Sequence, residues 1–167
     1  MIKVAEFENG KSLMLGDDCD LRMDFVSNIV CCMSEAYDNF YLPEIIRGVM
    51  KSDGITECVI NLKDIKHNAH WEKEDLRKYS YAIKEALKLI YNSFNNGITN
   101  DVLVCCSQGR SRSVGIVCLY LEMIGYIKGK TAYELIKEFE KMTGYKTDVG
   151  DGVYLLMEYY IKHKGEF

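Results

Sequence analysis

The most informative part of this sequence is the run VLVCCSQGRSRS, which ends at Ser113. A short apolar stretch delivers Cys106, and Gly109, Arg112 and Ser113 follow three, six and seven residues later. The apolar segment 114–121 comes next and is typical of a buried helix. We therefore expect a thiol, a turn that contains glycine, a guanidinium group and a helix N-terminus to converge on one point.

This combination predicts an anion site with a nucleophile at its floor. Backbone N–H groups of residues 107–111, together with the positive end of the helix dipole, would cradle an anion. The same field stabilises a thiolate, so we expect Cys106 to be the nucleophile. Arg112 would hold two phosphate oxygens through its planar fork, and Ser113 would donate to the Cys106 sulfur, cap the helix, or do both. The pattern predicts phosphoryl transfer through a covalent cysteine intermediate.

We expect the loop itself to hold the anion. The residues that would do so are Ser107, Gln108, Gly109, Arg110, Ser111 and Arg112. Gly109 permits the turn, and Arg110 either adds positive charge at the rim or is a solvated surface charge. The alternative interpretation of the run is a buried structural cysteine before a glycine turn, with Arg112 on the surface.

Alternating strands and helices are expected to position this loop. Candidate strands lie at 3–7, 12–15, 25–33, 55–62 and 102–105. Candidate helices lie at 39–51 with Pro43 in the first turn, at 76–94 with Asp75 as N-cap, between Thr131 and Gly144, and at 152–163. This order predicts an α/β domain with a central, mainly parallel sheet flanked by helices. Ligands of such sheets bind at the carboxyl ends of the strands, where Cys106 lies.

Composition and charge limit the possible domain organisation, partners and location of this protein. The 167 residues are 48% hydrophobic and 28% charged, which predicts a single domain over 1–167. A net charge of −4 argues against a nucleic-acid partner. We expect neither a signal peptide nor membrane association, because no apolar stretch is long enough. Seven cysteines without disulfide or zinc spacing indicate a reducing, cytoplasmic location.

The run that begins at Cys106 resembles the C-x5-R-S/T signature of the cysteine-dependent protein tyrosine phosphatases. Its Ser-Arg-Ser ending is most similar to the dual-specificity branch. The similarity extends to SLMLG at 12–16, IVCCMSE at 29–35 and GDGVY at 150–154. It implies a dual-specificity phosphatase-like fold, one phosphatase-like catalytic domain and a phosphorylated protein as substrate. The mechanism of this family needs neither a metal nor a cofactor.

Two positions depart from the family pattern. Cys32 stands where asparagine is usual, and Cys105 stands where histidine is usual. In the family that histidine helps to hold the loop and to keep the thiol acidic, and a cysteine cannot make the same hydrogen bonds. We therefore expect a Cys106 thiol that ionises less readily than in the family, and lower activity.

The leaving oxygen needs a proton, so a general acid should lie over the site. The resemblance implies an aspartate after a strand, about thirty residues before the cysteine. Asp64 follows the candidate strand 55–62 but lies 42 residues before Cys106, whereas Asp75 lies 31 residues before it. Asp75 also fits a helix cap, which would occupy its carboxylate, so we favour Asp64. Weaker candidates are His70, Glu72 and Glu74.

The leading hypothesis is a phosphatase that acts on phosphotyrosine and on phosphoserine or phosphothreonine in proteins. A second hypothesis is a non-catalytic phosphate-binding module, in which the cradle remains but the chemistry is lost. The intact pair of Cys106 and Arg112 argues against it, because a binding module needs no nucleophile. A third hypothesis keeps the enzyme but changes the substrate to a phosphoinositide or an RNA 5′-phosphate.

Overall fold

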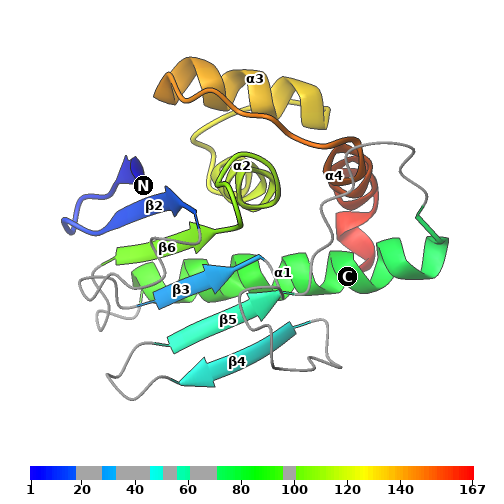
Figure 1. Cartoon of the computed structure of the whole chain (residues 1–167), viewed down its shortest axis with the longest axis horizontal. Helices are drawn as coiled ribbons and strands as arrows, with labels where there is room; N and C mark the ends of the chain where they lie inside the picture. The colour runs from blue at the N-terminus through cyan, green and yellow to red at the C-terminus, as the bar shows by residue number, and fades with distance from the viewer. Residues whose placement is uncertain (18–27, 33–45, 51–55, 61–70, 96–100) are drawn as a thin grey trace.

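A six-stranded sheet forms the centre of the described part of the chain (Figure 1). The computed structural model describes residues 1–17, 28–32, 46–50, 56–60, 71–95 and 101–167. The strands are β1 (Ile2–Glu6), β2 (Ser12–Gly16), β3 (Asn28–Cys31), β4 (Ile46–Met50), β5 (Thr56–Ile60) and β6 (Asp101–Cys105). Their order across the sheet is β1-β2-β6-β3-β5-β4, so the strand that precedes Cys106 lies in the interior of the sheet.

The interior of the sheet is parallel and its two edges are antiparallel. β2 and β3 both run parallel to β6, and β5 runs parallel to β3. β1 and β4 pair antiparallel at the edges. Cys105 lies opposite Gly16 on one side and opposite Cys31 on the other, so three strands end together beside Cys106. The predicted α/β fold with a mainly parallel sheet is confirmed. Cys106 lies at the carboxyl ends of the parallel strands, which is where ligands of such sheets bind.

The described helices pack in layers on this sheet (Figure 1). They are α1 (Lys73–Asn95), α2 (Arg112–Met123), α3 (Ala132–Thr143) and α4 (Asp151–His163), followed by a short 3-10 turn at Lys164–Glu166. α1 lies across β3, β5 and β6, and α2 lies on β2 and β6. Because the two helices also contact each other, they cover the same face of the sheet. α3 and α4 contact α2, and residues 112–121 are all buried. A helix that is apolar on nearly all sides needs such enclosure.

The sequence predicts one apolar helical face on α1, formed by Leu76, Tyr79, Ile83, Leu87, Ile90 and Tyr91, and the structure buries four of these residues. Leu76 is only half-buried and Tyr91 is exposed. Tyr79, Ile83, Leu87 and Ile90 are buried and recur every three or four residues, so they form one stripe toward the sheet. Burying each leucine or isoleucine side chain contributes about 1.5–3 kcal/mol. None of the described helices is both long and apolar enough to cross a membrane.

α3 begins and ends where the sequence predicts. Thr131 is its N-cap, and the Thr131 hydroxyl accepts a hydrogen bond from the Glu134 N–H at 3.1 Å. Gly144 ends the helix in a left-handed conformation with φ of 69°, which glycine adopts without strain. The chain then runs to Gly150, the N-cap of α4. The residues between these two helices prove important for the site.

The helix predicted at 39–51 is wrong where the structure describes it. Residues 46–50 form β4, and Pro43, with the rest of 39–45, lies outside the described residues. β4 pairs antiparallel with β5, where Ile46 lies opposite Ile60. Pairing with a neighbouring strand outweighs the local helix signal, which Gly48 already weakens.

Candidate active site

Cys106 is held between the ends of two neighbouring strands. Its N–H donates to the Gly16 carbonyl at the end of β2, at 3.4 Å, and the Cys32 N–H after β3 donates to the Cys105 carbonyl at 2.8 Å. The Cys106 side chain is only 2% exposed. The backbone of the sheet therefore fixes the position of the thiol at the floor of the loop 106–112.

Ser113 lies beside the sulfur. Its Oγ is 3.1 Å from Sγ of Cys106, and both residues are buried. The sequence also offered Ser113 as the helix cap, and that part is wrong. α2 begins at Arg112, and its N-cap is Ser111, whose hydroxyl instead accepts a hydrogen bond from the Gly150 N–H at 3.0 Å. The position of Ser113 in the first turn directs its hydroxyl to the sulfur and fits the predicted role as a donor to the thiolate.

Gly109 makes the tight turn of the loop. Its φ is +67°, and a Cβ at this position would lie 2.7 Å from the Gly16 carbonyl oxygen. The loop therefore packs directly against the end of β2, backbone to backbone. Only glycine combines a positive φ with such a close approach.

Arg112 is a buried cation at the start of α2. It is 5% exposed, which excludes the alternative of a surface arginine. Burial of a charged group costs free energy unless the group is compensated. A buried guanidinium six residues after the thiol, at the far end of the same loop, is suited to meet an anion.

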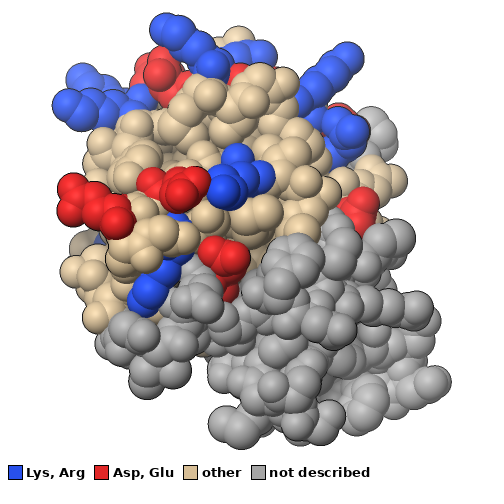
Figure 2. Space-filling model, turned by 90° about the vertical axis from the view of Figure 1, so that its left-hand side faces the viewer, with Lys and Arg blue, Asp and Glu red and all other residues tan. Residues whose placement is uncertain are grey.

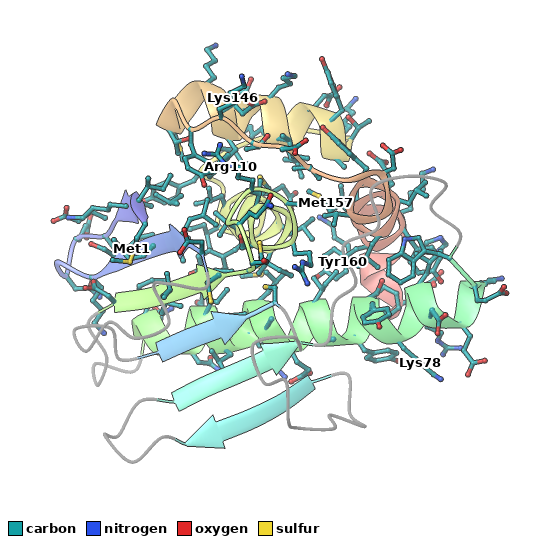
Figure 3. The ribbon with its side chains drawn as sticks, in the orientation of Figure 1. Met1, Lys78, Arg110, Lys146, Met157 and Tyr160 are labelled. Carbon is teal, nitrogen blue, oxygen red and sulfur yellow. The ribbon has the colours of Figure 1, made fainter. Side chains whose placement is uncertain are left out.

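Arg110 faces away from the floor of the loop. Its Nη1 donates to the Lys146 carbonyl at 2.7 Å, and its guanidinium lies 5.5 Å from the centroid of the Tyr145 ring. Figure 3 labels Arg110 between α2 and α3, with Lys146 above it at α3. The Arg110 side chain thus anchors the loop to residues that the sequence did not connect with it.

Residues 144–150, the segment that joins α3 to α4, form an outer support for the loop. The Tyr145 hydroxyl donates to the Gly109 carbonyl at 2.8 Å, and the Asp148 N–H donates to the Arg110 carbonyl at 2.9 Å. The Gly150 N–H donates to the Ser111 hydroxyl. Three consecutive loop residues are therefore held by one segment. The sequence signal was weak, since only the Gly144 helix end indicated that the chain turns here.

The general acid candidates are placed unequally. Asp64, with His67 and His70, lies outside the described residues. Asp75 is exposed, and its predicted role as N-cap is wrong, because α1 already begins at Lys73. An acidic residue is favourable in the first turn as well as at the cap, which explains the misplacement.

The chain that enters α1 lies close to the start of α4. Nε1 of Trp71 donates to the Gly152 carbonyl at 2.9 Å. Gly150, two residues earlier, contacts Ser111 of the loop. The Trp71 side chain therefore lies close to the residues that support the loop.

The remaining predicted loop residues differ in exposure. Ser107 is half-buried and Gln108 is exposed. Among the residues that the structure describes, no group of three or more His, Cys, Asp or Glu side chains could hold a metal ion. Burial, reinforced by the Glu140 carboxylate, raises the pKa of the Cys118 thiol far above its ordinary value, so this cysteine remains a neutral core residue.

Comparison with known proteins gives a family and a fold. A family model described as the Rit1 DUSP-like domain matches residues 63–166. No curated protein matches the sequence. The structure is similar to that of human DUSP28, with 13% identity and a TM-score of 0.62 over 99% of both chains. It is similar to PTPMT1 in complex with PI(5)P, with 15% identity and a TM-score of 0.62 over 92% of both chains.

DUSP15 gives the same result, with 17% identity and a TM-score of 0.61 over 100% of this chain and 96% of that chain. At such low identity the likeness shows the fold. It confirms the predicted resemblance to the cysteine-dependent, dual-specificity phosphatase-like proteins.

Proposed function

This chain belongs to the family of the Rit1 DUSP-like domain, and from that premise we propose that it hydrolyses phosphomonoesters through a covalent intermediate on Cys106. The observation that carries the proposal is the buried contact of 3.1 Å between Sγ of Cys106 and Oγ of Ser113. It lies at the floor of a loop that ends with a buried arginine, Arg112, at a helix N-terminus. An anion bound there would meet a nucleophile and positive charge together.

The proposed reaction has two steps. The Cys106 thiolate attacks phosphorus in line, the bond from phosphorus to the leaving oxygen breaks, and that oxygen takes a proton from the general acid. Arg112 and the backbone N–H groups of 107–111 hold the equatorial oxygens. Water then attacks phosphorus, its proton passes to the carboxylate, and the thiolate leaves with a hydrogen bond from Ser113.

We propose Asp64 as the general acid. It follows the strand β5, and the chain between it and α1 leads to Trp71, whose side chain contacts the start of α4. Asp75 is the alternative. It is fixed in the first turn of α1 and is exposed to solvent, which suits a helix-stabilising charge.

Phosphorylated proteins are the first substrate class to test. The Ser-Arg-Ser ending resembles the dual-specificity branch, and the net charge of −4 disfavours a polyanionic partner. On the described part of the face in Figure 2, basic side chains are interspersed with acidic ones. A second class is RNA carrying a phosphate, since the name of the matching family refers to an initiator tRNA.

The direct test is phosphate release from para-nitrophenyl phosphate. Cys106→Ser should lower turnover about 10³-fold or more, because serine is a far weaker nucleophile at neutral pH. Its affinity for inorganic phosphate should persist, since the backbone donors and Arg112 remain. Cys118→Ala is the matched control, because this buried thiol lies outside the loop and should leave turnover intact.

Two outcomes would contradict parts of the proposal. Unchanged turnover in Cys106→Ser would exclude the covalent mechanism. A wild-type protein that binds phosphate but releases none from any ester would instead be a binding module. Comparison of a phosphotyrosine peptide, a phosphothreonine peptide, a 5′-phosphorylated RNA oligonucleotide and phosphoinositide vesicles would then separate the substrate classes.

A further inference from the structure

Hydrogen bonds to the outward-facing carbonyls of the loop 106–112 determine how its inward-facing N–H groups are oriented. A peptide unit is planar and trans, so its C=O and the N–H of the next residue point in opposite directions. A hydrogen bond that fixes a carbonyl outward therefore fixes the following N–H inward. An anion cradle depends on such inward N–H groups, and a peptide that rotates would present an oxygen to the anion instead.

Tyr145 fixes the peptide of the loop that could otherwise rotate most easily. Its hydroxyl donates to the Gly109 carbonyl at 2.8 Å, which orients the N–H of Arg110 in the opposite direction. Glycine has the widest choice of backbone conformations, and Gly109 already has a positive φ. Without an outer donor, the peptide between Gly109 and Arg110 would be the easiest in the loop to rotate.

The same tyrosine also engages the next side chain. The Arg110 guanidinium lies 5.5 Å from the centroid of the Tyr145 ring and donates to the Lys146 carbonyl. Asp148 completes the support, since its N–H donates to the Arg110 carbonyl at 2.9 Å and thereby orients the N–H of Ser111. Two successive peptides of the loop are held from the same side.

Tyr145 is itself fixed in place. Its N–H donates to the Thr143 hydroxyl at 3.1 Å, and its ring packs edge-on against the buried Phe139, with centroids 6.4 Å apart. Gly144, in its left-handed conformation, sets the direction in which the chain leaves α3. Because packing already holds the ring, little conformational entropy is lost when its hydroxyl forms the hydrogen bond to the Gly109 carbonyl. Most of the free energy of that hydrogen bond is therefore available to fix the loop.

We propose that Tyr145 is a positioning residue for the anion-binding loop and that it holds the Arg110 N–H toward the bound phosphoryl group. The inference rests on the proposed function of this loop. Cys105, which precedes the nucleophile, offers only a weak S–H donor. Tyr145, which lies 36 residues after Gly109, supplies a stronger hydroxyl donor to the same loop.

The test compares Tyr145→Phe with wild type in the whole protein, with tungstate as the oxyanion in calorimetric titration. Phenylalanine keeps the ring, its packing on Phe139 and its contact with Arg110, and removes only the hydroxyl. Loss of one neutral hydrogen bond should weaken tungstate binding about fivefold. For para-nitrophenyl phosphate, kcat should fall more than KM rises, because the loop N–H groups contact the oxygens most strongly in the transition state.

The matched control is Tyr133→Phe. Tyr133 lies on α3 and is 59% exposed, so its hydroxyl should matter neither to tungstate affinity nor to kcat. Thermal unfolding of both variants separates positioning from stability, since a less stable but correctly shaped loop would keep its tungstate affinity at room temperature. Tungstate affinity within about twofold of wild type in Tyr145→Phe, with kcat unchanged, would overturn the inference.

The two proposals can fail separately. A wild-type protein that binds tungstate but hydrolyses no ester contradicts the proposed catalysis, while the affinity of Tyr145→Phe still decides the role of the hydroxyl. A wild-type protein that neither binds tungstate nor hydrolyses any ester overturns both. Normal turnover together with an unaffected Tyr145→Phe variant overturns the positioning role alone.

Discussion

Gly109→Ala tests how closely the loop depends on its contact with the end of β2. Two separate costs apply to this substitution. A residue with a Cβ at φ of +67° costs about 1–2 kcal/mol relative to glycine. The new Cβ would also lie 2.7 Å from the Gly16 carbonyl oxygen and 3.0 Å from its carbon, distances that folded proteins do not accommodate without movement.

The second cost is steric, because the backbone must move to relieve the clash between the new Cβ and Gly16. Ordinary van der Waals contact begins near 3.4 Å, so the loop and Gly16 would have to separate by about 0.7 Å. The Gly16 carbonyl also accepts from the Cys106 N–H at 3.4 Å, and this bond would be lost on such a shift. Loss of one hydrogen bond costs about 1 kcal/mol. We expect Gly109→Ala to destabilise the protein by about 2–4 kcal/mol and to weaken tungstate binding more than about tenfold.

Gly125→Ala separates the two costs. Gly125 has a similar φ of +81°, but no atom lies within 4 Å of the position that a Cβ would take there. It also lies beyond the opposite end of α2 from the loop. This variant should lose only the conformational part, about 1–2 kcal/mol, and keep full tungstate affinity. Denaturant unfolding and calorimetric titration measure both quantities. If Gly109→Ala proved no more destabilising than Gly125→Ala and bound tungstate normally, the close approach to Gly16 would not constrain the loop.

Three further substitutions test individual residues. Arg112→Lys should lower both phosphate affinity and kcat about tenfold or more, because lysine keeps the charge but not the bidentate fork, and near-normal kinetics would exclude a phosphate contact. Asp64→Asn should slow esters with poor leaving groups far more than those with good ones, and the same pattern in Asp75→Asn would assign the acid there instead. Cys105→His should speed iodoacetamide alkylation of the nucleophile at mildly acid pH and shift the acidic limb of the rate–pH profile to lower pH. The larger side chain at this buried position should cost about 1–3 kcal/mol of stability through overpacking. Unchanged alkylation would mean that the loop is held by other partners.

The local parts of the site could be predicted because their signals are contiguous. Cys106, Gly109 and Arg112 lie within one run, between an apolar strand and an apolar helix, so spacing alone places them together. The helix cap was harder, since Ser111 and Ser113 are both suitable residues. Which one caps α2 depends on where the chain leaves the loop, and the bond from Gly150 to Ser111 shows that tertiary contacts decide it.

Distant contacts could not be predicted from one sequence. Tyr145 looks like an ordinary aromatic residue after a helix, and nothing in its neighbourhood indicates a carbonyl 36 residues earlier. The same holds for β4, because the backbone partners that favour a strand at 46–50 belong to β5. Such choices depend on pairing across the fold, which local propensity does not encode.

The Gly16 carbonyl shows that backbone contacts, as well as side chains, fix the shape of this site. It accepts from the Cys106 N–H and, on the same side, limits the space at Gly109. If β2 moved away to admit a larger residue, the strand end that holds the nucleophile would be released. The loop is therefore confined between the end of β2 and the hydroxyl of Tyr145, and a change on either side should be detected as a loss of anion affinity before the fold is lost.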